Sequence, residues 1–410
     1  MRKVVSMYKS SLFCHGGWGV EKLCILFLVI TCIFSACTPQ AETTLPAEAT
    51  VPPTSPPKPT ETPPPASTAT SSEPTLTPVT VPLELSQPGP LFTGKRTFTF
   101  ADPARDDREV KVTIYYPAIK PEGYKGTMAS NGEPDLSGAP YPVILSGGRT
   151  GGAFAAHMVS YGFVMIGVDS TGSYEGWDFW LVDLPMDMVF ALDQVASRPL
   201  EGLDGMIDAS RAGAMGYSSD GYDALAVSGA RIDPQYYLEK CAGAASMDPA
   251  LPEWWIEYIC GPSQKWDAFA ERAGESITAS EDGLWQPITD DRILAVMPMG
   301  PEGAWLFGER GLAAVNRPVL IIAAGEDEIN YYDLEAVPIF EQLGTPDKGM
   351  VTFIGKTHMM VFDDNPFADM RHFAAAFFGY HLQGKTEYAR YFSEEYLAAY
   401  PRFAWGVYTR

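Results

Sequence analysis

Strand-like apolar runs alternate with helical stretches through most of this chain of 410 residues. Several of the runs are continuous and apolar, which is typical of strands buried on both faces of a parallel sheet. The strand-like segments are 96–100, 110–116, 141–145, 163–168, 212–217, 293–297, 318–323 and 350–354. The helical segments are 153–161, 179–196, 220–228, 332–343 and 367–380. A first hairpin followed by this alternation predicts an α/β fold, an open and mostly parallel sheet with helices on both faces.

One segment interrupts the alternation. Residues 231–291 separate a predicted helix from the next predicted strand, and they contain Trp254, Trp255, Trp266 and Trp285. Ligands of open α/β sheets bind outside the carboxyl ends of the strands. We therefore interpret 231–291 as a helical cap that is inserted over that edge.

The first 36 residues have the character of a signal peptide. Basic residues precede an apolar run at 23–36, which is too short to span a bilayer comfortably. The run ends in Ser35-Ala36 before Cys37, and so resembles the signal of bacterial lipoproteins, in which the cysteine is lipidated and becomes the new N-terminus. The resemblance implies a membrane-anchored protein outside the cytoplasm, at the cell surface or secreted. The alternatives are an uncleaved anchor and an ordinary secretory signal.

A segment rich in proline and threonine follows, with 13 Pro and 12 Thr among the 45 residues of 38–82. Such a composition cannot bury a core and favours extended polyproline II backbone. We therefore interpret 37–91 as the lipidated cysteine and a linker, and 92–410 as one folded domain that contains the insertion.

Charge and missing motifs exclude several classes of function. The net charge is −22 and no run of Lys or Arg follows the first 25 residues, so we expect no nucleic-acid partner. The sequence has no Walker motif, dinucleotide fingerprint or metal-ligand cluster, so we expect neither a cofactor nor a metal. Beyond Cys37, the remaining cysteines are Cys241 and Cys260. In an oxidising compartment we expect them to form a disulfide, the alternative being two buried free thiols.

The segment 212–221, AGAMGYSSDG, carries the first candidate for catalysis. A strand of small and apolar residues runs into Ser218, and a helix follows. This pattern resembles the nucleophile elbow of the α/β-hydrolase family, Gly-x-Ser-x-Gly, with Gly216 at the first small position. Asp220 stands where the pattern has its second glycine, and Gly221 comes one place later. The resemblance implies that Ser218 is a nucleophile.

The family order of Ser, acid and His predicts the other two catalytic residues. The acid should follow the next-to-last strand, where spacing counted from Pro318 selects Asp327 and spacing counted from Gly325 selects Glu328. We favour Asp327. The histidine should follow the last parallel strand, and of five histidines only His358 lies on a predicted loop there.

The resemblance also implies an oxyanion hole made of two backbone N–H groups. One is that of Ser219, the residue after the nucleophile, and the other is that of Arg149, in the glycine-rich loop after the third strand. Tyr217, Trp305 and Phe307 are candidate walls of a substrate pocket, because they flank the nucleophile or follow a core strand near the active edge.

Segments 141–148 and 291–297, with the cysteine-containing insertion, resemble the branch of the family that contains predicted dienelactone hydrolases and platelet-activating-factor acetylhydrolase-like esterases. The resemblance covers 92–385 and implies a serine esterase acting on a small-molecule or lipid ester, of short-acyl or phospholipid type. A dienelactone hydrolase would use a cysteine nucleophile, where this chain has Ser218. The alternatives are a peptidase or acyltransferase on the same scaffold, and a non-catalytic surface lipoprotein that binds through its Trp-rich cap.

Overall fold

The computed structural model of the protein describes residues 82–169 and 177–409, all of which belong to the larger of the chain's two contact units, residues 78–410. The predicted signal peptide, the lipidation site Cys37 and most of the linker lie outside the described residues. In the described part of the chain, no helix is both long and apolar enough to cross a membrane.

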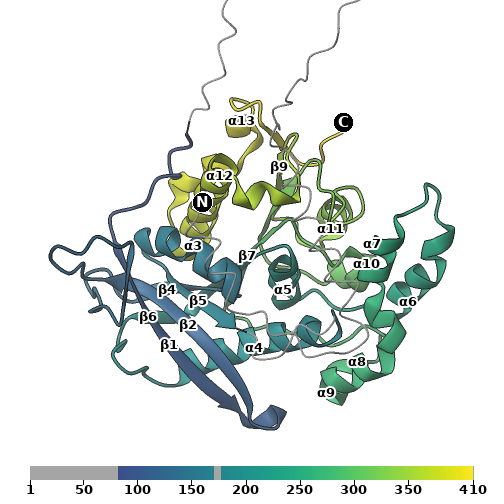
Figure 1. The fold of residues 1–410 in the computed structure, drawn as a ribbon, viewed down its shortest axis with the longest axis horizontal. Helices are drawn as coiled ribbons and strands as arrows, with labels where there is room; N and C mark the ends of the chain where they lie inside the picture. Colours follow the sequence, from purple (N-terminus) through teal and green to yellow (C-terminus); the bar gives the residue numbers. More distant parts are fainter. Residues whose placement is uncertain (1–81, 170–176, 410) are drawn as a thin grey trace, which may run out of the picture. The chain divides into compact units, whose positions relative to one another are not determined.

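A ten-stranded sheet forms the centre of the described domain, in the order β10-β9-β8-β7-β6-β4-β5-β2-β1-β3 (Figure 1). Neighbouring strands from β5 to β9 are parallel, whereas β2 is antiparallel to β1 and β5, and β10 is antiparallel to β9. The strands are β1 (Phe92–Asp102), β2 (Arg108–Ala118), β3 (Met128–Ser130), β4 (Tyr141–Gly147), β5 (Val164–Asp169), β6 (Ile207–Tyr217), β7 (Ile293–Met299), β8 (Val319–Ala324), β9 (Lys348–Phe353) and β10 (Phe403–Trp405). The predicted α/β architecture with a mostly parallel sheet is confirmed.

Helices cover both faces of this sheet (Figure 1). Within β4, Ile144 packs with the helices α3 and α12, whereas its neighbours Val143 and Leu145 belong to the core formed with α4 and α5. Successive side chains of a strand point to opposite faces, so a strand covered on both sides must be apolar throughout. The main helices are α3 (Gly148–Ser160), α4 (Trp177–Ser197), α5 (Ser219–Val227), α10 (Ala304–Leu312), α11 (Ala336–Gln342), α12 (Asp364–Gln383) and α13 (Glu394–Leu397).

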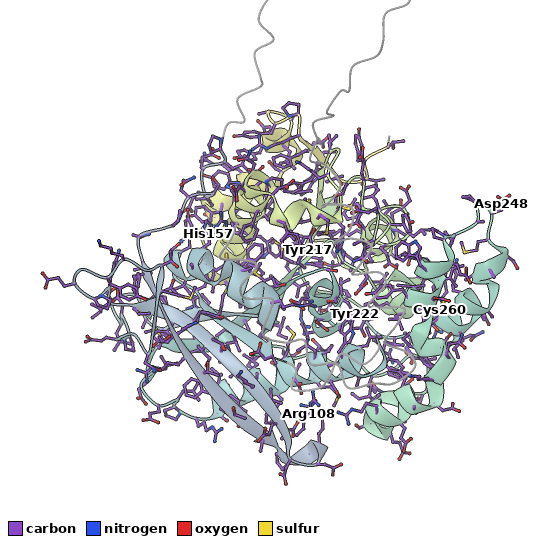
Figure 2. The ribbon with its side chains drawn as sticks, viewed as in Figure 1. Arg108, His157, Tyr217, Tyr222, Asp248 and Cys260 are labelled. Atoms are coloured by element: carbon purple, nitrogen blue, oxygen red, sulfur yellow. A yellow bond between two sulfur atoms is a disulfide. The ribbon has the colours of Figure 1, made fainter. Side chains whose placement is uncertain are left out.

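The segment between α5 and β7 is helical, as predicted, and we call residues 231–291 the helical insertion. Its helices are α6 (Pro234–Gly243), α7 (Glu253–Ile259), α8 (Trp266–Ala273) and α9 (Glu275–Thr278). Trp266 and Trp285 pack together within the insertion, with ring centroids 5.4 Å apart. The disulfide between Cys241 and Cys260 joins α6 to the end of α7, so the predicted pairing is confirmed (Figure 2).

The insertion reaches the carboxyl edge of the sheet through α7. The indole Nε1 of Trp255 donates to the carbonyl of Ile329, 3.0 Å away, in the loop after β8. The Tyr258 hydroxyl donates to the Glu302 carboxylate in the loop after β7, at 3.0 Å. In contrast, α8 packs against α4 and carries Arg272, which pairs with Asp183 there. The insertion therefore braces the loops of β7 and β8 rather than standing apart from the sheet.

Several boundaries differ from the sequence prediction. The helix predicted from 153 begins at Gly148, and the strand predicted from 212 begins at Ile207. The helix predicted at 332–343 begins only at Ala336. Glu335, the residue before it, accepts the backbone N–H of Ala304 at 2.8 Å through its carboxylate. The folded domain also begins before residue 92. The backbone N–H of Leu85 donates to His372 Nδ1 on α12 at 3.0 Å, and Leu83 and Leu85 are buried. The last part of the predicted linker therefore packs on the domain.

A buried ion pair joins β2 to α4. Arg108 donates through Nε and Nη2 to both carboxylate oxygens of Asp187, at 3.0 and 2.9 Å, and Asp187 is completely buried (Figure 2). Arg105 also faces this carboxylate, with Nη2 2.6 Å from Asp187 Oδ1. Removing Arg108 therefore takes away the cation that contacts both oxygens of a buried carboxylate and leaves Arg105 as its remaining cation.

We expect Arg108→Leu to lower the free energy of unfolding by about 3–5 kcal/mol. The matched control is Lys111→Leu on the same strand, whose ammonium lies 3.9 Å from Asp169 in an exposed pair. That control should change the free energy of unfolding by less than about 1 kcal/mol. Urea denaturation followed by circular dichroism measures both, and equal losses for the two variants would contradict the assignment.

Candidate active site

Ser218 lies in a sharp turn between β6 and α5, at the carboxyl edge of the sheet. Its backbone has φ 60° and ψ −123°, in a region that residues other than glycine rarely adopt. The N–H of Ser218 donates to the carbonyl of Met299 at 2.9 Å, which ties the turn to the end of β7. At Gly216 an added Cβ would lie 1.7 Å from the carbonyl oxygen of Asp220, so the first position of the turn requires glycine.

A chain of hydrogen bonds joins Ser218 to His358 and Asp327. The His358 ring places Nε2 2.9 Å from Ser218 Oγ and Nδ1 2.8 Å from Asp327 Oδ2. His358 and Asp327 are buried, while Ser218 is half-buried. When Nδ1 carries the proton and donates to the carboxylate, Nε2 is free to accept the hydroxyl proton of Ser218. Such a chain can activate the serine oxygen for attack on a carbonyl carbon.

The two acids after β8 have different partners. Asp327 Oδ1 accepts the backbone N–H groups of Ile329 and Asn330, at 3.0 and 2.8 Å, which fixes the carboxylate against the His358 ring. The carboxylate of Glu328 instead accepts the backbone N–H of His358 at 2.8 Å. Of the two candidates left by the sequence, Asp327 is therefore the one that contacts the imidazole, and Glu328 holds the histidine loop.

Tyr217, labelled in Figure 2, contacts the catalytic candidate His358. Its ring centroid is 5.4 Å from that of His358, and its hydroxyl donates to the His358 carbonyl. Burial, together with the nearby carboxylates of Asp327 and Glu328, raises the pKa of the Tyr217 hydroxyl well above its usual value. The hydroxyl therefore stays protonated and remains a donor to the histidine loop.

The two predicted oxyanion donors lie at the beginnings of neighbouring helices. Ser219 is the first residue of α5 and Arg149 the second of α3, so neither N–H has an acceptor within its own helix. Arg149 Nη2 donates to Ser219 Oγ at 3.0 Å, which shows that the two helix starts are adjacent. Helix N-termini carry partial positive charge and attract developing negative charge. That Arg149 and Ser219 bind an oxyanion stays a prediction.

The other two candidate pocket walls lie in the core. Trp305 and Phe307 are on α10, a helix that the sequence did not predict, and only 4% and 1% of their surfaces are exposed. Trp305 packs edge-on against Trp255, and Phe307 stacks on Tyr222, each pair with centroids 5.1 Å apart. Both rings are thus covered by other side chains, and their contact with a substrate stays a prediction.

Buried acids near this edge were missed by sequence reasoning. Glu302, after β7, and Glu335, before α11, are completely buried. Burial raises the pKa of each to about 8, and for Glu302 the neighbouring Glu335 adds to the shift. Asp223, one turn along α5, is also buried, and its carboxylate makes no hydrogen bond to any of the residues that the structure describes. A lone acid in a loop or helix has no spacing that would reveal burial from the sequence.

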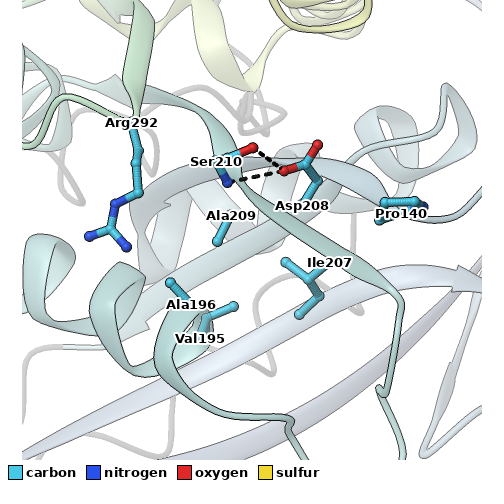
Figure 3. Close-up of a pocket in the computed structure, with 8 residues that line it drawn as sticks. All are labelled: Pro140, Val195, Ala196, Ile207, Asp208, Ala209, Ser210 and Arg292. Carbon is cyan, nitrogen blue, oxygen red and sulfur yellow. Dashed lines mark hydrogen bonds between the residues drawn. The ribbon is translucent and has the colours of Figure 1, made fainter.

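A cavity of about 430 Å³ lies at the opposite end of β6 from Ser218 (Figure 3). It is bordered by Ile207, Asp208 and Ser210 at the beginning of β6 and by Arg292. Asp208 accepts hydrogen bonds from Ser210 and Arg211, and the residues that line the cavity include no histidine. A second cavity, of about 680 Å³, lies beside the disulfide in the helical insertion. Neither cavity includes Ser218, Asp327 or His358.

Within residues 82–169 and 177–409, no group of three or more His, Cys, Asp and Glu side chains is placed to hold a metal ion. The sequence matches no protein-family model, and no curated protein is similar enough to it to count as a match. The chemistry of the site therefore has to be argued from its geometry.

The buried pair Glu302 and Glu335 makes a prediction about pH. Their pKa values rise from 4.5 in the unfolded chain to about 8 in the folded one, so the folded state holds more protons. The contribution of these two groups to the free energy of unfolding should then be greatest below about pH 4.5 and fall as pH rises to about 8, by at most about 1.4 kcal/mol per pH unit for each group.

We expect the double variant Glu302→Gln and Glu335→Gln to lose most of this decline, because an amide does not ionise. Urea midpoints measured between about pH 5 and about pH 8 test the expectation. Glu253→Gln, at an exposed position on α7, is the matched control and should keep the slope of the unaltered protein. A double variant with an unchanged slope would show that other groups cause the pH dependence.

Proposed function

We propose that this protein is a serine hydrolase with an α/β-hydrolase fold that cleaves carboxylic esters. The observation that carries the proposal is the hydrogen-bonded chain from Ser218 through His358 to Asp327. It occurs at the carboxyl ends of parallel strands, where α/β proteins bind their ligands. The strained backbone of Ser218, between a strand and a helix, supports the assignment of that residue as the nucleophile.

The reaction proceeds through an acyl-enzyme. Ser218 Oγ attacks the ester carbonyl while His358 Nε2 takes the hydroxyl proton, and Asp327 stabilises the imidazolium that forms. The backbone N–H groups of Ser219 and Arg149 receive the negative oxygen of the tetrahedral intermediate. His358 then protonates the departing alcohol, which breaks its bond to the acyl carbon. In the second half of the reaction, water attacks the acyl carbon while His358 takes a proton from it. His358 then returns a proton to Ser218 Oγ as the acyl–serine bond breaks, and the acid is released.

The substrate we propose is a short-acyl or phospholipid-type ester, and the location is outside the cytoplasm. The disulfide between Cys241 and Cys260 is compatible with an oxidising compartment. In this proposal Cys37 is lipidated and holds the domain at a membrane through the linker. A second candidate is a non-catalytic lipoprotein with the same fold, which is favoured by Asp220 in place of a glycine in the turn after Ser218.

Hydrolysis of p-nitrophenyl acetate, butyrate and octanoate tests the proposal. We expect the full-length protein to hydrolyse at least one ester, and Ser218→Ala to lower kcat by about 10⁴-fold or more. A fluorophosphonate probe should label the unaltered protein and leave Ser218→Ala unlabelled. If the unaltered protein hydrolyses none of the esters and takes up no probe, the non-catalytic candidate replaces this one.

The two neighbouring acids provide a sharper test. Asp327→Asn should lower kcat by about 10³–10⁴-fold, because an amide facing Nδ1 favours the wrong imidazole tautomer. Glu328→Gln should lose less than about 10-fold, because its amide oxygen still accepts the backbone N–H of His358. Steady-state kinetics at neutral pH measures both. The reverse order of losses would make Glu328 the catalytic acid.

A further inference from the structure

Asp220 occupies the position where the elbow pattern has its second glycine, and the structure gives its side chain a defined set of partners. Asp220 is the second residue of α5 and only 3% exposed. Its carboxylate reaches across to α3, where Oδ2 accepts the hydroxyl of Thr150 at 2.6 Å and the backbone N–H of Thr150 at 3.2 Å. The Thr150 hydroxyl oxygen in turn accepts the backbone N–H of Tyr217 at 3.2 Å.

These bonds join the three segments that surround the candidate oxyanion hole. Thr150 directly follows Arg149, and Asp220 directly follows Ser219, so each partner of the bridge is one residue from a predicted donor. Tyr217 precedes the nucleophile and closes the connection to β6. A displacement of α3 relative to α5 would therefore move the two N–H groups apart, and oxyanion stabilisation falls steeply when donors are misplaced.

The backbone around Asp220 has room for this carboxylate and for little else. At Gly147, the residue before α3, an added Cβ would lie 2.4 Å from Asp220 Oδ1. The elbow has an aspartate in place of its second glycine, and the facing residue Gly147 has no side chain, which leaves space for the Asp220 carboxylate. Gly221 allows α5 to pack closely against the end of β7, since a Cβ there would lie 3.1 Å from Pro301 Cα.

A carboxylate beside an oxyanion would oppose the reaction if its charge were not balanced. Here the starts of α3 and α5 both face it, and helix N-termini stabilise negative charge. The Arg149 guanidinium adds a cation, with Nη2 4.0 Å from Asp220 Oδ1. Asp220 Oδ2 thus accepts both bonds of the bridge to Thr150, and Oδ1 lies on the side of the Arg149 guanidinium.

We propose that Asp220 is a positioning residue, which fixes the spacing of the Arg149 and Ser219 N–H groups by joining Thr150 on α3 to α5. The inference rests on the proposed esterase function. The presence of Asp220 in place of the second glycine is then compatible with that function, because its carboxylate holds the two oxyanion donors in position.

Kinetics of four single variants and one double variant of the full-length protein tests this role. Asp220→Ala should lower kcat by about 10²–10³-fold and change KM by less than about 3-fold, because the lost interaction acts in the transition state. Asp220→Asn should recover kcat to within about 10-fold of the unaltered protein, since its amide oxygen can accept both bonds from Thr150. Thr150→Val should lower kcat in the same direction, and Thr150→Ser should not. The double variant Asp220→Ala with Thr150→Val should lose no more than the worse single variant.

Asp208→Ala is the matched control. Asp208 also accepts the N–H and hydroxyl of a nearby residue, Ser210, but at the far end of β6 (Figure 3). Its removal should leave kcat and KM unchanged. If Asp220→Ala does not fold, as judged by circular dichroism, the comparison of Thr150→Val with Thr150→Ser decides alone.

The outcomes separate this inference from the proposed function. If the unaltered protein is active and Ser218→Ala is not, but Asp220→Ala and Thr150→Val keep kcat within about 3-fold, the positioning role is wrong and the esterase remains. A rise in KM with unchanged kcat would also overturn the role, because it would indicate ground-state binding. If the unaltered protein neither hydrolyses esters nor takes up the fluorophosphonate probe, both proposals fail.

Discussion

The parallel strands are buried on both faces, and this packing determines the positions of their carboxyl ends. The residues of the candidate site follow these ends directly. The segments that follow β4, β6, β8 and β9 contain the predicted oxyanion donors, Ser218, Asp327 and His358. These strands come from distant parts of the chain, and parallel pairing brings their carboxyl ends to one edge. The apolar side chains of the strands therefore do more than stabilise the domain, because they set the distances between the polar groups at this edge.

The same edge concentrates unfavourable features that a stable fold has to tolerate. Ser218 has a backbone conformation that costs about 1–3 kcal/mol in a residue other than glycine. Glu302 and Glu335 are buried close by, with pKa values raised to about 8 by desolvation. The helical insertion contributes directly here, through the hydrogen bond of Tyr258 to Glu302 and that of Trp255 to the loop after β8. Strain and burial of this kind gather at functional sites and are offset by packing elsewhere.

Asp220 illustrates how a local departure from a pattern can be consistent with the fold. From the sequence alone, an acid in a tight turn counts against a nucleophile elbow. In three dimensions, the carboxylate binds Thr150 and fits against Gly147, two residues that lie far from it in the sequence. The departure at Asp220 makes a contact between two segments, and a pattern confined to one segment cannot reveal such a contact.

The sequence by itself determined most of the alternating strands and helices and the helical insertion, because periodicity within single segments reflects short-range physics. The resemblance of two segments to the α/β-hydrolase pattern pointed to Ser218 and His358 as the residues to examine. Only the tertiary structure decided that Asp327 contacts the imidazole while Glu328 holds its backbone. It also decided that Trp305 and Phe307 lie in the core on a helix that was not predicted. Those choices depend on which side chains meet across the edge of the sheet, and such distances are set by packing among segments far apart in the chain.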